Sequence, residues 1–133
     1  MDKIGTLEIK DLKNASPLEL AEAIVKVLDS KKAGGLKLLH VSDKTVIADY
    51  FIICTGTSNT QIRALANEVE YQIGEAGVYP GHIEGLDDAT WVLLDYASVI
   101  VHVFHGETRR FYNLEKLWAD AGEVDISGLI TEN

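Results

Sequence analysis

The segment Cys54-Thr-Gly-Thr-Ser58 has the residue types of a phosphate-binding turn. A glycine-bearing turn that leads from a buried strand into a capped helix points backbone N–H groups and the positive end of the helix dipole at an anion. The same residues also make a tight strand-to-helix connection, with Ser58 as the N-cap. We favour the capping interpretation, because capping alone requires these residue types, and keep anion binding as the alternative.

An enzyme that used this turn for nucleotide chemistry would also need carboxylates. Nucleotidyltransferases hold two divalent cations, usually with two acids spaced one residue apart on a neighbouring strand. Here Asp95 stands alone in its predicted strand, and the adjacent Asp87 and Asp88 would point to opposite faces of an extended chain. We therefore predict no catalytic residue. The alternative is a nucleotide-binding enzyme that recruits Glu84, Asp87 and Asp88 from a loop.

The histidines and the single cysteine do not have the pattern of a metal site. His40, His82, His102 and His105 lack the close spacing of structural zinc ligands, and the sequence contains no HExxH motif. His102 is expected to be a half-buried strand residue, and Cys54 a buried small hydrophobic residue. We predict no metal and no cofactor.

Large amphipathic side chains in the second half of the chain are of the types that dominate protein–protein contacts. They are Trp91, Tyr96, Arg109, Tyr112 and Trp118. Trp118 and Phe111 fall on an apolar helical stripe, which is typical of core residues. Trp91 and Tyr96 flank a run of Val and Leu, so they could equally pack across strands. Contact and core roles both stay open for these aromatic residues.

Local patterns predict the elements that would position these residues. Ser16, Pro17 and Glu19 have the form of a capping box, which starts a helix that ends near residue 33. Ser58 and Gln61 repeat the pattern for a second helix that ends at residue 77. Apolar runs predict strands at residues 36–41, 49–55, 91–96 and 99–104, and helical spacing predicts a third helix at 108–121.

These elements predict the fold class. The last two strands are separated by only Ala97-Ser98 and should form an antiparallel hairpin. The order α-β-β-α-β-β-α fits an α/β (α+β) fold with a single mixed β-sheet flanked by helices. A length of 133 residues suits one domain. We assign residues 16–121 to this domain, 1–15 to an N-terminal extension and 122–133 to a loose, acidic C-terminal tail.

The charge of the chain restricts its partners. Twelve Lys plus Arg against 21 Asp plus Glu leave a formal net charge of −9, which repels phosphate and disfavours direct nucleic-acid binding. The same charge would steer the protein to a basic protein, although it also suits a soluble enzyme. The sequence shows no signal-peptide core and no segment with the apolar length of a membrane span, so we expect a cytoplasmic protein without membrane association.

Four segments resemble, in order and spacing, the signature segments of the RsfS/Iojap family of ribosomal silencing factors. They are ADYFIICTGTS at 48–58, WVLLDY at 91–96, VHVF at 101–104 and RFYNLEKLW at 110–118. The resemblance runs from about residue 18 to residue 118. It implies a nucleotidyltransferase-like fold without the catalytic acids. Where family members often carry Gly-Asp in the hairpin turn, this chain has Ala97-Ser98.

The resemblance also implies a function. Family members bind the large ribosomal subunit at its basic protein L fourteen and keep the small subunit from joining, which represses translation as a stress response to nutrient limitation. The implied contact residues are Trp91, Tyr96 and Tyr112, with Lys44, Asp49, Asp95 and Arg109 as polar neighbours. Asp49 could instead fix the turn before its strand, and Asp95 could pair with Arg109 or Arg110. The aromatic residues could also form a homodimer.

Overall fold

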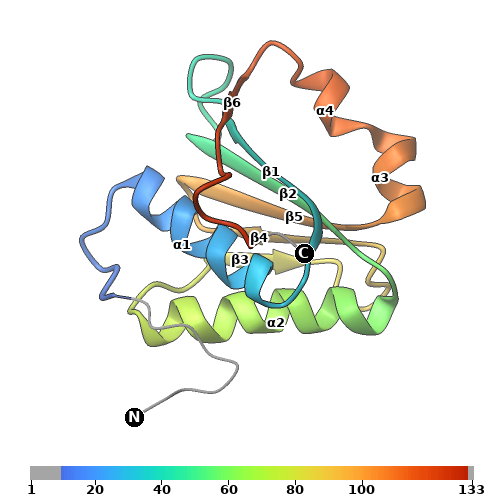
Figure 1. Cartoon of the computed structure of the whole chain (residues 1–133), viewed down its shortest axis with the longest axis horizontal. Helices are drawn as coiled ribbons and strands as arrows, with labels where there is room; N and C mark the ends of the chain where they lie inside the picture. The colour runs from blue at the N-terminus through green and yellow to red at the C-terminus, as the bar shows by residue number, and fades with distance from the viewer. Residues whose placement is uncertain (1–9, 132–133) are drawn as a thin grey trace.

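The computed structural model describes residues 10–131, which form one six-stranded sheet with helices on both sides (Figure 1). The helices are α1 (Pro17–Ser30), α2 (Asn59–Glu75), α3 (Gly106–Tyr112) and α4 (Leu114–Leu117). The strands are β1 (Gly34–His40), β2 (Tyr50–Gly56), β3 (His82–Glu84), β4 (Trp91–Asp95), β5 (Val99–His105) and β6 (Gly122–Val124). Their order in the sheet is β3-β4-β5-β2-β1-β6. β2 and β5 run parallel and the other neighbours antiparallel, which confirms the predicted mixed sheet and its β4–β5 hairpin.

The capping box at the start of α1 is present as predicted. The Ser16 Oγ accepts a hydrogen bond from the Glu19 backbone N–H at 3.1 Å, and a Glu19 carboxylate oxygen accepts one from the Ser16 N–H at 2.9 Å. The two bonds satisfy N–H groups that have no partner within the helix. The bond from the Ser16 backbone also holds the pKa of the Glu19 carboxyl below its usual value.

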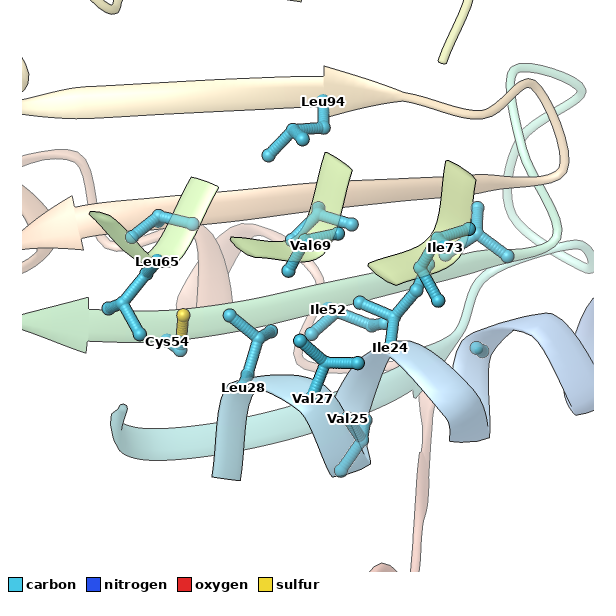
Figure 2. Packing of buried hydrophobic residues seen from close by; sticks show 14 of the residues in the cluster. Ile24, Val25, Val27, Leu28, Ile52, Cys54, Leu65, Val69, Ile73 and Leu94 are labelled. Atoms are coloured by element: carbon cyan, nitrogen blue, oxygen red, sulfur yellow. The ribbon is translucent and has the colours of Figure 1, made fainter. Parts of the chain in front are cut away.

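Helices α1 and α2 cover one face of the sheet and form the larger hydrophobic core. Figure 2 shows side chains of both helices directed toward one another and toward the strands. The fully buried members of this core include Ile24 and Leu28 of α1, Ile52 of β2, and Val69 and Ile73 of α2. Burying one such side chain stabilises the fold by about 1.5–3 kcal/mol. Cys54 lies in this core as predicted, and burial raises the pKa of its thiol to about 12.

The opposite face of the sheet carries a smaller cluster, on which α3 and α4 lie (Figure 1). Its buried members are Leu39, Val41, Ala48, Phe51, Ile53, Ile100 and Phe104. Trp118, which follows α4, packs on this cluster and meets the Phe51 ring edge-on, with ring centres 5.1 Å apart. Trp118 therefore has the packing role that its helical spacing indicated.

The predicted third helix is in fact two short helices. Asn113 lies between α3 and α4 in a left-handed conformation (φ 49, ψ 59), which asparagine adopts more readily than most residues. Its side chain accepts a hydrogen bond from the Lys116 N–H at 3.3 Å and so caps α4. The break interrupts the helical periodicity, and the Phe111 residue is 79% exposed. The core role expected for Phe111 is wrong.

Residues 122–124 are part of the sheet. β6 pairs antiparallel with residues 38–40 of β1, and Ile126 is buried in the larger core. The N–H and the hydroxyl of Thr131 donate hydrogen bonds to Asp29 in α1 at 2.9 and 2.7 Å. The expectation of a loose tail is therefore wrong for residues 122–131. A strand of three residues is too short to show a period, and β3 was missed for the same reason.

Candidate functional site

Trp91 begins β4 and lies on the sheet face opposite α1 and α2. Its ring packs against Phe104 of β5 and against Tyr112 at the end of α3, with ring centres 4.9 Å apart in both cases. The indole Nε1–H donates a hydrogen bond to Nδ1 of His102 at 3.1 Å. Trp91 is half-buried, so these neighbours fix one part of the ring while another part faces solvent.

His102 is buried, with 5% of the residue exposed, rather than half-buried as predicted. Burial lowers its pKa to about 4, so the ring is neutral at pH 7. Since Nδ1 accepts the bond from Trp91, the ring proton lies on Nε2, for which residues 10–131 supply no hydrogen-bond partner. The ring also stands edge-on to Phe51, with centres 5.1 Å apart. His102 acts here as the acceptor that orients Trp91.

Trp91 is part of a surface that we call the aromatic face, made of Trp91, Leu93, Tyr112, Glu84 and Asp95. The residues at 91, 93 and 95 alternate along β4, so their side chains leave the same side of the sheet. Glu84 of β3 pairs directly with Leu93 and points to that side too. Tyr112 is 53% exposed, and the three β4 residues are half-buried. The aromatic face is thus apolar at its centre, with carboxylates beside it.

The predicted contact residues fall into two groups rather than one. Trp91, Tyr112 and Arg109 lie where β4 begins, beside the ends of β5 and β2. Lys44, Asp49, Asp95 and Tyr96 lie toward the other end, where Asp49 donates its N–H to the Ser98 carbonyl of the hairpin turn at 2.8 Å. The four residue steps from Trp91 to Asp95 put these two residues about 13 Å apart along β4. Lys44 is exposed in the loop between β1 and β2.

Several of these residues serve the protein's own structure. Tyr96 is 7% exposed and packs in the core beneath α1 and α2, so its side chain is withdrawn from the surface, and burial raises the pKa of its phenol. Asp95 accepts a hydrogen bond from the Ala97 N–H at 2.7 Å and so holds the hairpin turn. Within residues 10–131, Asp95 forms an ion pair with neither Arg109 nor Arg110, and Arg109 pairs with Glu115 instead.

Sequence reasoning missed Leu93 as a surface residue. Its neighbours Val92 and Leu94 are fully buried in the core beneath α1 and α2, whereas Leu93 points to the other side with Trp91. The alternation of side chains along a strand would have placed Leu93 beside Trp91 once Trp91 was chosen. The signal was therefore present in the spacing of the two residues.

Hydrogen-bond donors in the turn at residues 54–58 are already paired with side chains of the protein itself. The Gln61 Oε1 accepts hydrogen bonds from the Thr57 N–H at 2.5 Å and from the Thr57 hydroxyl at 2.9 Å. The Ser58 Oγ accepts one from the Gln61 N–H at 3.0 Å, so the Ser58 half of the predicted capping box forms. A phosphate would have to displace the Gln61 carboxamide. These contacts favour the capping interpretation of the turn.

The loop with the adjacent aspartates is fastened to α2. Arg63 donates hydrogen bonds to the carbonyls of Leu86 and Asp87, and Asn59 donates one to the carbonyl of Asp88 at 2.9 Å.

Across residues 10–131, no three His, Cys, Asp or Glu side chains gather in a way that could hold a metal ion. In that same part of the chain, no helix combines the length and apolar character needed to cross a membrane.

The fold and the site define a small α/β protein with one mixed sheet, with α1 and α2 over one side and α3, α4 and the aromatic face on the other. The family model described as "Ribosomal silencing factor during starvation" matches residues 14–133. The chain belongs to this family of ribosomal silencing factors, as the resemblance of its four segments implied.

Relatives in bacteria and plants carry the family's names. The ribosomal silencing factor RsfS of Halalkalibacterium halodurans is 42% identical over 113 residues, which cover 85% of this chain and 97% of that protein. RsfS of Bacillus subtilis is 45% identical over 98 residues, covering 74% and 83% of the two chains. The chloroplastic Iojap protein of Arabidopsis thaliana is 31% identical over 131 residues, covering 93% of this chain and 51% of that protein. These relatives are named as silencing factors or Iojap proteins and not as enzymes.

Two crystal structures have the same fold. A protein from Chromobacterium violaceum is 35% identical and superposes with a TM-score of 0.76, covering 78% of this chain and 87% of that one. A protein from Bacillus halodurans is 39% identical and superposes with a TM-score of 0.72, covering 81% and 98% of the two chains.

Proposed function

We propose that this protein binds the large ribosomal subunit and sterically blocks the small subunit from joining it. Its contact on the large subunit is the basic protein L fourteen, and its action represses translation in the cytoplasm when nutrients are limiting. Membership in the ribosomal silencing factor family supports the proposal. The action requires no covalent chemistry, because a bound protein excludes a second partner by its volume.

The observation that carries the proposal is the arrangement of Trp91 between Phe104 and Tyr112, with Leu93 beside it on β4. Half-buried aromatic side chains in such surroundings are the residues that dominate the binding energy of protein–protein contacts. Packing on Phe104 and the bond to His102 already fix the indole, so binding needs little further ordering of this side chain.

The charge of the protein suits a basic partner. Glu84 and Asp95 put carboxylates beside the apolar residues of the aromatic face, and the whole chain carries a formal net charge of −9. Complementary charge speeds the encounter of two proteins more than it tightens the final complex. The rate of association should therefore fall as salt is raised, because salt screens the attraction between charges that are more than about 10 Å apart.

Sedimentation of the purified protein with isolated ribosomal subunits through a sucrose gradient, at low and moderate salt, tests the proposal. We expect comigration with the large subunit alone and loss of the joined particle. Trp91→Ala should weaken the complex about thirtyfold, because truncating such an aromatic residue costs at least about 2 kcal/mol. Tyr71→Ala is the matched control, since Tyr71 is exposed on α2, which covers the other face of the sheet.

Two outcomes would contradict the proposal at different levels. A folded Trp91→Ala variant that binds the large subunit at full affinity would remove the assignment of the aromatic face. Absence of comigration at either salt would remove the function itself.

Sedimentation equilibrium of the protein alone tests the homodimer. A dimer that Trp91→Ala dissociates would mean that a second copy covers the same face.

A further inference from the structure

Arg109 joins segments that are far apart in the sequence. Its Nη1 donates a hydrogen bond to the Thr55 hydroxyl at 2.7 Å, and its Nε donates one to a Glu115 carboxylate oxygen at 2.9 Å. The Nη2 lies 2.8 Å from the same Glu115 oxygen. The two charged side chains are only 12% and 26% exposed, so water screens this pair less than a surface pair. Arg109 thus ties α3 to α4 and to the end of β2.

Gly35 makes room for the Arg109 guanidinium on β1. The residue has a φ of 54°, and a Cβ built on it would lie 2.7 Å from Nη1 of Arg109. Glycine meets both demands, because it adopts left-handed backbone conformations without strain and has no side chain to collide with the guanidinium. The contact makes β1 the third segment, after β2 and α4, that meets Arg109.

Besides Arg109, this segment is held by the ring contact of Tyr112 with Trp91 and by the packing of Leu114 and Trp118 on the smaller cluster. α3 has seven residues and α4 has four, and neither helix, both of which the structure describes in full, buries a residue completely. Helices this short are not stable by themselves in water. Tyr112 follows Arg109 by three residues, so both lie on the same side of α3, and the Tyr112 ring centre is 4.9 Å from that of Trp91.

We propose that Arg109 is a positioning residue of the aromatic face. It holds α3 against the sheet so that Tyr112 stays beside Trp91, and it does so from behind the surface that the partner touches. Thr55 gives the motif at residues 54–58 a role in this arrangement, since its hydroxyl is one of the two acceptors for Arg109. The inference rests on the proposed function, because the aromatic face is the surface that it positions.

The expected effect follows from the fraction of molecules in which α3 is correctly placed. A partner that binds only that arrangement has an apparent affinity reduced by this fraction. Arg109→Lys keeps the positive charge but replaces the fork of N–H donors by a single ammonium, which cannot reproduce the bonds to both Thr55 and Glu115. If about one molecule in ten then has α3 in place, large-subunit binding weakens about tenfold.

The test compares two measurements on the same variants. Amide hydrogen exchange of the free protein reports whether residues 106–117 are held, and sedimentation with the large subunit reports binding. We expect Arg109→Lys and Thr55→Val to speed exchange in residues 106–117 and to weaken binding, with α1 and α2 unchanged. Arg110→Lys is the matched control, because Arg110 is the exposed neighbour of Arg109 and should change neither measurement.

The pair of measurements separates the possible failures. Weaker binding with unchanged exchange would overturn the proposal, because Arg109 would then touch the partner directly. Faster exchange with unchanged binding would overturn it as well, because Arg109 would then be merely structural. If the unaltered protein does not bind the large subunit, the proposed function fails and the positioning role falls with it, whatever the exchange shows.

Discussion

The indole Nε1–H of Trp91 donates a hydrogen bond to Nδ1 of His102 at 3.1 Å, between neighbouring strands of the sheet. The bond requires a neutral imidazole, because a protonated ring carries hydrogen on both nitrogens and accepts none. The orientation of Trp91 in the aromatic face is therefore linked to the protonation state of a buried histidine.

We expect the protein to become less stable as the pH is lowered, because of His102. Burial lowers the pKa of this group from 6.5 to about 4 in the folded protein, so the unfolded chain binds more protons between these values. The contribution of the neutral ring is therefore complete above pH 6.5 and is lost as the pH falls toward 4. Between about pH 7 and 5 this loss amounts to about 2 kcal/mol in the free energy of unfolding, which urea titrations measure.

The variant His102→Gln isolates this effect, since a Gln carboxamide can accept the bond from Trp91 without titrating. Its free energy of unfolding should change less between about pH 7 and 5 than that of the unaltered protein. Asn67→Gln, at an exposed position on α2 that does not titrate, should keep the original dependence. Equal pH dependence of the His102→Gln variant and the unaltered protein would show that His102 is not responsible.

Ala97→Gly should stabilise the protein. Ala97 in the hairpin turn has a φ of 70°, a left-handed conformation that costs a residue with a Cβ about 1–2 kcal/mol. Glycine removes this cost but has more freedom to lose on folding, so we expect a net gain of about 0.5–1 kcal/mol. Ala64→Gly is the control, because Ala64 is exposed within α2 and the same change there should destabilise by a similar amount. Thermal unfolding of both variants measures the two shifts, and a loss of stability in Ala97→Gly would refute the strain.

Ile126→Ala should destabilise the protein, because this side chain belongs to the larger core although it lies beyond the family's last signature segment. Truncating a buried isoleucine leaves a cavity, and at this position near the surface we expect a cost of about 2 kcal/mol. Glu123→Ala is the control, since Glu123 is exposed on β6. Urea unfolding distinguishes the two, and equal stability of both variants would mean that the C-terminal segment adds nothing to the core.

Calorimetry with a nucleotide and magnesium should give no heat of binding. The Gln61 carboxamide oxygen already accepts hydrogen bonds from the N–H and the hydroxyl of Thr57, so the turn offers fewer free donors to a phosphate. Gln61→Ala removes that carboxamide, and heat in this variant alone would identify Gln61 as the group that excludes phosphate. Magnesium-dependent heat with the unaltered protein would instead restore the enzymatic alternative.

The features that were predictable from the sequence depend on neighbouring residues. Ser16 and Glu19 are three residues apart, and their reciprocal hydrogen bonds need only the first turn of α1. The β4–β5 hairpin likewise needs only two β-rich runs with two residues between them. Such patterns predict local structure well, because the interacting groups are already close along the chain.

The features that were missed depend on contacts between distant segments. Tyr96 follows β4, and alternation along the chain shows that it points to the same side as Val92 and Leu94. Alternation does not show which side the helices cover, because the packing of α1 and α2 decides that. β6 is defined by its pairing with β1, about 80 residues earlier in the chain. The break at Asn113 belongs with these, since α3 and α4 are held by Arg109, Tyr112 and Trp118 on the sheet.

The outermost strands of the sheet, β3 and β6, have three residues each. A foreign peptide that extends a sheet needs a long row of unpaired backbone groups on the last strand, and strands this short offer few. The protein is therefore poorly suited to recruit other chains by backbone pairing, in solution or on a crowded ribosome. What it can offer a partner is a pattern of side chains, and such a pattern distinguishes one partner from another better than a backbone that all proteins share.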